Sequence, residues 1–145
     1  MKIYCKTVTF NTEKELQFID CTEKIKKIIS KANIKEGFVN IFSKHTTLAL
    51  KINENEKLLM NDFAYFLKKI IPNKKYSHDN ISLRENCSPS EPKNAKAHLK
   101  TILLETSQFI PIHKKILVLG KWQRIFLIET CGPRRREIVI QIMGN

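Results

Sequence analysis

Apolar residues recur along the chain at two different spacings, and each spacing predicts one kind of element. Side chains of a strand point alternately to its two faces, so apolar residues at every second position indicate a half-buried strand. Apolar residues at i, i+3, i+4 and i+7 share one face of a helix. From the first spacing and the flanking turn residues we predict strands at residues 2–10, 15–20, 37–43, 47–53, 107–112, 115–119, 124–131 and 136–143.

Three other stretches have the helical spacing. The first follows Asp20, a possible N-cap with Glu23 at the capping-box position. Its apolar face comprises Cys21, Ile25, Ile28, Ile29 and Ala32. We predict that the second helix begins at Asn53, because Asn53 and Glu56 have N-cap and N3 spacing. Its apolar face comprises Leu59, Phe63, Phe66 or Leu67, and Ile70. The third helix is short, begins at Asn94 and is expected to turn Leu99, Ile102 and Leu103 inward.

The segment between the second and third helices, residues 73–93, is rich in Asn, Ser, Asp and Pro, and we interpret it as a loop. It contains the sequence Tyr76-Ser77-His78-Asp79. A loop of this length inside a compact domain is usually functional or mobile. His78 is therefore a candidate site residue.

Length and composition limit the class of protein. A chain of 145 residues with 42% hydrophobic content is in the range of one globular domain, and we assign residues 1–145 to it. The sequence shows neither a signal peptide nor an apolar run of the roughly 18 residues that span a bilayer, so we expect a cytoplasmic protein without membrane contact. The formal charge of +12 comes mostly from scattered lysines. It attracts polyanions, but no nucleic-acid recognition motif accompanies it, and no specific nucleic acid is expected.

The last strands contain a carboxylate in an apolar setting. Glu129 shares a strand face with Ile125 and Leu127, so its charge is predicted to be buried and to require a partner. Gly132-Pro133 ends the strand, and the arginines of residues 134–136 follow. Two interpretations remain open: an anion-binding site built around the turn, or a buried Glu–Arg pair that only holds strands together.

The four cysteines form no C-x-x-C pair, and we expect free thiols. Cys131 lies close to Arg134 and Arg135, which favour the thiolate. The alternative is a small buried residue at the end of a strand.

Histidines supply the remaining candidate chemistry. His45 is followed by two hydroxyl residues, Thr46 and Thr47, and can either ligate a metal or bind an oxyanion. His45, His78 and His98 all have polar or acidic neighbours, and three imidazoles with a carboxylate suit a zinc-like ion. Their separations match no local metal motif, so three unrelated histidines are the alternative.

Several of these segments occur in a recognisable order: HTTLALKINENE, YSHD, NAKAHLK and LGKWQRIFLIETCGPRRR. Together they resemble the motif series of the YjbQ-like family, which is also labelled secondary thiamine-phosphate synthase. The resemblance implies a compact α+β domain with an antiparallel β-sandwich-like core and two or three helices. It also implies a homotrimer in which the polar motif residues form a pocket for a metal or an anion near subunit contacts.

Transferred position by position, the resemblance implies three sets of site residues. His45, His98 and Glu129 are candidate catalytic residues, and His45, His78 and His98 are candidate ligands of a divalent metal, Zn²⁺ or Mg²⁺. The candidate substrate- and phosphate-binding residues are Thr46, Thr47, Asn53, Glu54, Asn94, Trp122, Gln123, Gly132, Arg134 and Arg136.

The chain departs from the family pattern at four positions. Cys131 and Lys96 stand where the family has acidic residues, and Glu105 and Arg124 stand where it has glycines. The loss of two acids is expected to weaken metal binding or to change the substrate. The leading hypothesis is a weak, thiamine-phosphate synthase-type transfer on phosphorylated small molecules, possible with or without a metal. A non-catalytic trimer that binds a phosphorylated metabolite or a metal is the alternative, and polyanion binding through the +12 charge is the third.

Overall fold

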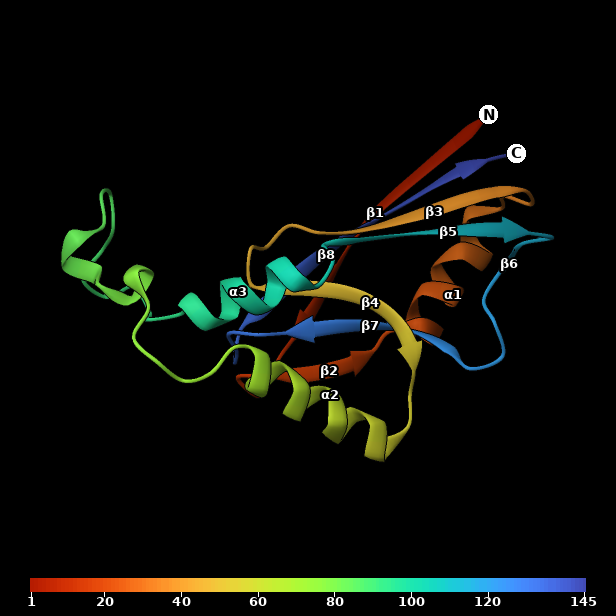
Figure 1. The fold of residues 1–145 in the computed structure, drawn as a ribbon. Coiled ribbons are helices and arrows are strands. Elements are labelled where there is room, and N and C mark those ends of the chain that lie inside the picture. The colour runs from red at the N-terminus through yellow and green to blue at the C-terminus, as the bar shows by residue number, and fades with distance from the viewer.

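A computed structural model describes residues 1–145 and shows two antiparallel sheets with three helices (Figure 1). The larger sheet has the order β1 (Lys2–Asn11), β8 (Arg135–Gly144), β3 (Gly37–Ser43), β5 (Ser107–His113) and β6 (Ile116–Leu117). The smaller sheet has the order β2 (Gln17–Asp20), β7 (Gln123–Glu129) and β4 (Leu48–Glu54). The predicted α+β class and sandwich-like core are confirmed.

The core lies between the sheets and under α1 (Thr22–Ala32). In β8, Ile138, Ile140 and Ile142 are fully buried at alternate positions, as the period of the strand requires. From α1, Ile25 and Ile29 enter the same core, each contributing about 2–3 kcal/mol of hydrophobic stabilisation. The helix begins one residue later than the Asp20 cap predicts, although the Asp20 carboxylate still accepts a hydrogen bond from Thr22 N at 3.0 Å.

The second helix, α2 (Lys57–Ile70), begins later than predicted because a different residue caps it. The Glu56 carboxylate accepts hydrogen bonds from the backbone N–H groups of Leu58 and Leu59, at 2.9 and 2.8 Å. These bonds also lower the pKa of the Glu56 carboxyl group. Asn53 remains in β4, opposite Arg124 of β7, so its prediction as the N-cap is wrong.

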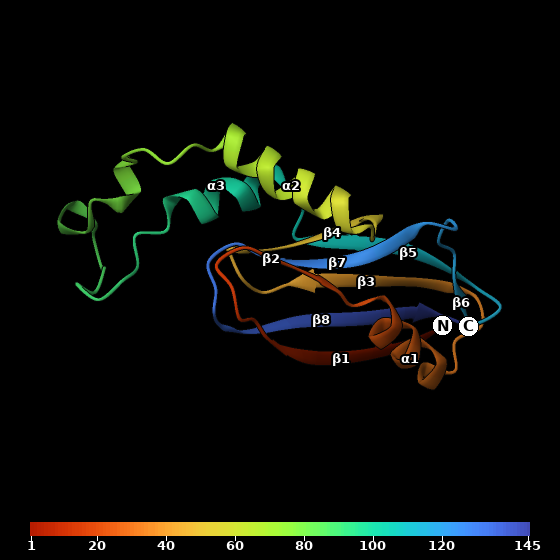
Figure 2. The same ribbon diagram turned by 90° about the horizontal axis from the view of Figure 1, so that it is seen from below.

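Helix α2 and helix α3 (Ala95–Leu103) are connected by residues 71–94, which extend away from the sandwich (Figures 1 and 2). This connection contains only two short 3₁₀ turns, η1 (Ser77–Asp79) and η2 (Ile81–Leu83), in agreement with the predicted long loop. No helix combines the length and the hydrophobicity that a membrane-crossing helix requires.

Helix α3 packs with the opposite face from the one predicted. Leu99, Ile102 and Leu103 were expected inside, yet Ile102 and Leu103 are 80% and 55% exposed. The buried face carries Lys100 and Thr101 instead. Thr101 turns inward because its hydroxyl forms hydrogen bonds with the Thr130 hydroxyl and the Ala97 carbonyl.

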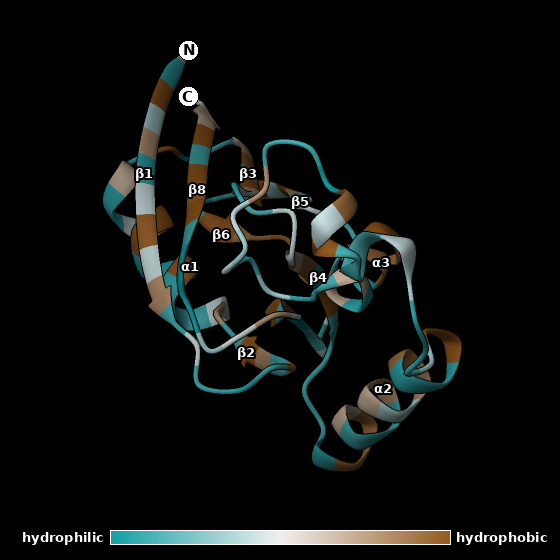
Figure 3. Cartoon of the chain, turned by 90° about the vertical axis from the view of Figure 1, so that its left-hand side faces the viewer, coloured by the Kyte–Doolittle hydropathy of each residue, from teal (hydrophilic) through white to brown (hydrophobic).

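Apolar side chains therefore remain exposed on both α2 and α3. They are Leu58, Tyr65, Phe66 and Ile70 on α2, and Leu99, Ile102 and Leu103 on α3. Figure 3 shows hydrophobic positions on these helices outside the sandwich. A monomer exposes large apolar side chains singly, whereas a group of them is typical of an interaction surface.

Candidate functional site

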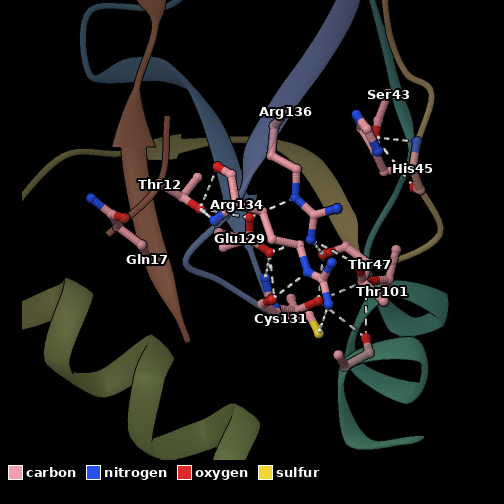
Figure 4. Close-up of polar contacts among 12 residues, drawn as sticks. Thr12, Gln17, Ser43, His45, Thr47, Thr101, Glu129, Cys131, Arg134 and Arg136 are labelled. Atoms are coloured by element: carbon pink, nitrogen blue, oxygen red, sulfur yellow. Dashed lines mark hydrogen bonds and ion pairs between the residues drawn. The ribbon is translucent and has the colours of Figure 1, made fainter. Parts of the chain in front are cut away.

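Glu129 and Arg136 form a bidentate ion pair where β7 ends and β8 begins (Figure 4). Arg136 Nε donates to Glu129 Oε2 and Nη2 donates to Oε1, both at 2.6 Å. The two residues are 0% and 4% exposed. The prediction that Glu129 is buried with a cationic partner is confirmed.

Three further donors occupy the Glu129 carboxylate. The Thr12 hydroxyl donates to Oε2 at 2.9 Å, and the backbone N–H groups of Thr130 and Cys131 donate to Oε1 at 2.9 and 2.8 Å. Burial alone raises the pKa of this carboxyl group, but Arg136 and these hydrogen bonds outweigh burial, so the pKa is lowered. A saturated, ionised carboxylate is a poor proton acceptor, which favours a positioning role for Glu129 over a direct catalytic one.

Arg136 is engaged within the chain. Besides Glu129, its Nη2 donates to the Thr47 hydroxyl at 2.9 Å. Two of its three nitrogens are thus used by protein acceptors. The expectation that Arg136 binds a phosphate does not fit this geometry, because a guanidinium bound bidentately to a carboxylate cannot offer the same edge to a ligand. For this residue the structure favours the interpretation as a buried pair.

Arg134 is the exposed arginine of the turn. Its Nε donates to the Cys131 carbonyl at 2.9 Å, and its Nη2 lies 3.8 Å from Cys131 Sγ. Its backbone N–H donates to the Thr12 hydroxyl at 2.8 Å, which ties the turn to the segment after β1. Arg134 is held at its base but remains accessible to an anion.

Gly132 allows the turn to pass close to its neighbours. A Cβ atom at this position would lie 2.3 Å from the Lys14 carbonyl oxygen and 2.8 Å from Glu129 Cγ. Any side chain here would therefore displace the backbone that holds Glu129. The predicted site residue Gly132 has a structural role that its sequence position alone does not explain.

His45 lies beside this cluster (Figure 4), with Thr46 exposed and Thr47 buried after it. Its Nε2 accepts a hydrogen bond from the backbone N–H of Glu137 at 2.9 Å, so the neutral ring is the form that fits. Burial, and next the charge of Arg136, lower the pKa of His45. The Nε2 atom is therefore not free to ligate a metal in this arrangement.

His78 of η1 and His98 of α3 form a separate pair. Their ring centroids lie 4.9 Å apart in an edge-on arrangement, beside a pocket of ≈ 410 Å³ that Tyr76, Ser77 and Leu99 also line. Burial, and then the charges of His78 and Arg84, lower the pKa of His98. The His78 Nε2 atom is buried without a hydrogen-bond partner.

The chain does not bring the three histidines into one cluster. No group of three His, Cys, Asp or Glu side chains is arranged to hold a metal ion. His78 and His98 meet, whereas His45 is bonded to the start of β8. Metal binding by His45, His78 and His98 stays a prediction, with no support from the geometry of a single chain.

Four predicted site residues lie at the opposite end of β7 from Glu129. Asn53 pairs with Arg124, and Glu54 pairs with Gln123, directly after Trp122. The residues of β7 from Gln123 to Glu129 span six steps of about 3.3 Å, which separates the two ends by about 20 Å. Glu54 and Trp122 line a pocket of ≈ 340 Å³ there. Within one chain the predicted site residues therefore lie in three separate places: around Glu129, around His78 and His98, and at the Trp122 end of β7.

Comparisons with known proteins agree with this fold. Residues 6–145 match the family model described as UPF0047 protein YjbQ-like. The chain belongs to the YjbQ-like family.

A UPF0047 protein of Methanothermobacter thermautotrophicus is 33% identical, over 100% of this chain and 95% of its own. One of Archaeoglobus fulgidus is 35% identical, over 94% and 98% respectively. A YbjQ-like protein of unknown function from Sulfolobus solfataricus has a solved structure with a TM-score of 0.89 and 33% identity, covering 99% of both chains.

Lys96 and Cys131 line the same pocket. It is a cavity of ≈ 90 Å³ whose lining comes mainly from α3, its N-terminal approach and the turn after β7. Its other lining residues are Glu15, Lys93, Asn94, Ala97, Thr130 and Gly132. Asn94 is thus near Cys131, but its side chain makes no capping hydrogen bond to α3.

The sequence interpretation missed several residues that build this region. Thr12 links the carboxylate of Glu129 to the backbone of Arg134, although nothing in its local sequence distinguishes it. The Thr130 hydroxyl donates to the Thr47 carbonyl at 2.6 Å and joins both segments to α3. Lys100 was also missed. Its spacing of four residues from Lys96 was a usable signal, because residues i and i+4 share a helix face.

Proposed function

We propose that this YjbQ-like protein binds a phosphorylated small molecule at the end of the sandwich formed by α3 and the turn after β7. The observation that carries the proposal is the accessible Arg134 guanidinium beside a pocket whose lining contains Lys93 and Lys96 and only one carboxylate, Glu15. Guanidinium and ammonium groups bind phosphate oxygens strongly through charge-assisted hydrogen bonds.

We further propose that the bound molecule undergoes a slow transfer of the thiamine-phosphate synthase type. In that reaction a thiazole ring nitrogen attacks the methylene carbon of a pyrimidine pyrophosphate. The carbon–oxygen bond breaks, and pyrophosphate leaves with the electron pair. Arg134 and Lys96 would stabilise the negative charge that develops on the departing group, since fixed cations are most effective where charge appears in the transition state.

The histidines have a different place in this proposal. The pKa values of His45 and His98 are lowered, so both imidazoles are neutral near neutral pH. The neutral imidazole of His98 can accept a proton from a substrate or a bound water. The His45 ring already accepts a hydrogen bond at Nε2, so its neutral form carries its proton on Nδ1 and has a positioning role. Glu129 acts through Arg136, by holding the turn and Thr47 in place. It is a positioning residue in this proposal.

A divalent metal fits this chain poorly. Mg²⁺ prefers oxygen ligands, and the chain offers no cluster of carboxylates, while a zinc site would find only the two imidazoles of His78 and His98. We therefore derive no step through a metal. A Zn²⁺ or Mg²⁺ requirement is a separate proposal, tested by adding and chelating each ion in the assay below.

The test is product formation from the pyrimidine pyrophosphate and the thiazole phosphate, measured by chromatography. We expect Arg134→Gln and His98→Ala to lower the rate at least tenfold. Arg135→Gln is the matched control, because Arg135 is exposed and reaches only Glu137, at 3.5 Å. Equal trace signals from the wild type, His98→Ala and Arg134→Gln would eliminate the transferase.

A non-catalytic role is the second candidate, and a specific observation favours it. All oxygens of Glu129 are occupied, and His45 is bonded to the backbone, so neither offers a free catalytic atom. In this case calorimetry would show binding of one precursor, with Arg134→Gln weakening it, while no product forms.

We also propose that copies of the chain associate as a homotrimer. The exposed apolar side chains of α2 and α3 support this proposal. Sedimentation velocity of the wild type is expected to give a trimer, and Ile102→Asp is expected to give a smaller species. Lys27→Asp, at an exposed position of α1, is the control. A monomeric wild type at micromolar concentration would contradict the proposal.

A further inference from the structure

Lys100 is a largely buried lysine without a partner. Its residue is 5% exposed, it lies on the inward face of α3, and it forms neither an ion pair nor a side-chain hydrogen bond with the protein. The other buried charged residues, Glu129 and Arg136, are paired with each other. The Nζ atom of Lys100 is not among the polar atoms closed off from solvent, so the stem is buried while the ammonium stays accessible. An accessible ammonium without a protein acceptor can form charge-assisted hydrogen bonds with an anion.

The position of Lys100 relates it to the small pocket between α3 and the turn after β7. Lys93, Lys96 and Lys100 are spaced by three and four residues, which places them along one side of α3 and its N-terminal approach. Lys93 and Lys96 line the pocket, and Lys100 lies one helical turn behind them. Its flexible four-carbon stem allows the ammonium to reach toward the pocket.

The charges around Lys100 are strongly unbalanced. Burial lowers the pKa of Lys100, Glu15 opposes this effect, and Lys96 and Lys68 lower the pKa further. The neighbourhood therefore contains Lys68, Lys96 and Lys100 against Glu15 alone. Such a concentration of ammonium groups destabilises the empty protein and is relieved when an anion binds.

We propose that the pocket between α3 and the Thr130–Gly132 turn is a subsite for a single phosphate group, with Lys93 and Lys96 as its ligands and Lys100, one helical turn after Lys96, as a further counter-ion. The volume of ≈ 90 Å³ has room for a phosphate group but not for a complete two-ring substrate. The rest of the molecule would extend past Arg134, whose Nη2 lies 3.8 Å from Cys131 Sγ in the pocket lining. The subsite specifies where the proposed function would hold its phosphate group. The identification of the ligand as a phosphorylated metabolite rests on that proposed function.

Calorimetry with inorganic phosphate and with the thiazole phosphate tests the subsite at constant ionic strength. We expect Lys100→Met to weaken the binding of both ligands at least tenfold. Lys27→Met, which removes an exposed lysine from α1, should leave both affinities within twofold. Binding of inorganic phosphate alone would identify a site for the free ion, and binding of the phosphomonoester alone would identify a metabolite site; either supports the subsite. Equal affinities for the wild type and Lys100→Met, or equal losses in Lys100→Met and Lys27→Met, would overturn it.

A second measurement uses the wild type and does not depend on the folding of a variant. Cys131 lines the pocket, whereas Cys5 and Cys87 lie outside it and serve as internal controls. Saturating phosphate should slow the alkylation of Cys131 by iodoacetamide at least fivefold, as followed by peptide mass spectrometry, and leave Cys5 and Cys87 unchanged. An unchanged rate at Cys131, or equal slowing at all three thiols, would contradict the subsite.

The failure of this inference can be told from the failure of the proposed function. If phosphate binds through Lys100 but no product forms from the two precursors, the subsite stands and the transferase does not. If product forms at the same KM in the wild type and in Lys100→Met, the transferase stands and the subsite does not.

Discussion

Glu129 and Arg136 join the two sheets at one end of the sandwich. Glu129 ends β7 of the smaller sheet and Arg136 lies at the start of β8 of the larger sheet, and two hydrogen bonds of 2.6 Å connect them. The same pair reaches Thr12 after β1 and Thr47 before β4. Four segments that are distant in the sequence are therefore fixed by one ion pair, which makes this end rigid enough to carry a site.

The first prediction concerns the stability of that pair. Glu129→Gln removes the charge and leaves Arg136 buried without a counter-ion. Removing one partner of a buried ion pair costs about 3–5 kcal/mol. We expect a loss of this size in the unfolding free energy measured by urea titration. Glu137→Gln is the control, because Glu137 forms only partly exposed ion pairs with Lys44 and Arg135 and should cost below about 1 kcal/mol. Equal losses in both variants would refute the role of the pair.

A second prediction follows from the lowered pKa of Glu129. The folded protein holds the ionised carboxylate more strongly than the unfolded chain does. The stabilisation is therefore complete above the unfolded pKa of about 4.3 and is lost as pH falls through the lower folded pKa. The difference in urea midpoint between the wild type and Glu129→Gln should be constant from pH 7 to 5 and should shrink below pH 4. A constant difference down to pH 3 would argue against this origin.

The sequence predicts those elements whose apolar positions are also their buried positions. In β8 and α1 the residues that define the period are the residues of the core, so both elements are predicted closely. Helix α3 fails this condition. Its apolar residues Ile102 and Leu103 face outward, because Thr101 forms hydrogen bonds with the turn after β7 and thereby sets the helix orientation. Periodicity identifies an apolar face but does not show whether the same chain covers it.

The candidate site, like the fold, could be predicted only in part from the sequence. A carboxylate on an apolar strand requires a partner, and that requirement alone predicts the pairing of Glu129. Which arginine provides it depends on the turn geometry, and Arg136 is selected over Arg134 because it returns on the adjoining strand. The separation of Trp122 from Glu129 follows from the length and direction of β7. Motif order carries no information about such distances.

Gly132 gives the third prediction. Gly132→Ala would place a methyl group against the Lys14 carbonyl oxygen, Glu129 Cγ and the Thr12 hydroxyl, at 2.3, 2.8 and 2.9 Å. Since backbone atoms are among these neighbours, the turn must move, at a cost of about 1–3 kcal/mol. Thermal unfolding should show the loss, and phosphate binding should weaken with it. Gly120→Ala is the matched control, because the nearest atom there is the flexible Gln123 side chain at 3.4 Å. A variant at position 132 as stable as that control would contradict the close approach.

His45 gives the fourth prediction. Its pKa is lowered, so the fold prefers the neutral ring that accepts the hydrogen bond from Glu137 N. The stabilisation from His45 is complete above the unfolded pKa of about 6.5 and is lost as pH falls through the folded pKa. His45→Gln keeps an acceptor that does not titrate, so its stability should depend less on pH between 7 and 5. The measurement is the urea midpoint of both proteins at each pH. Parallel pH profiles would contradict the prediction.

The fifth prediction concerns Lys100, whose charge lowers the stability of the fold, whereas the charge of Glu129 raises it. Its pKa is lowered, so the fold disfavours the ammonium that the unfolded chain carries freely. The resulting penalty is complete below the folded pKa and disappears as pH rises toward the unfolded pKa of about 10.4. Lys100→Met keeps the apolar stem and should therefore raise the unfolding free energy at pH 7 in phosphate-free buffer. The gain should stay below about 1 kcal/mol, because the ammonium keeps contact with solvent.

This gain should decline as pH rises through the folded pKa toward about 10.4. It should also be reduced by phosphate, which stabilises the wild type more than the variant. Lys27→Met, at an exposed position of α1, is the control and should change stability little. A Lys100→Met variant that is less stable than the wild type in phosphate-free buffer would show that the chain itself satisfies the ammonium. A more stable variant that no longer binds phosphate would show that this lysine is retained for a ligand at a cost to the stability of the fold.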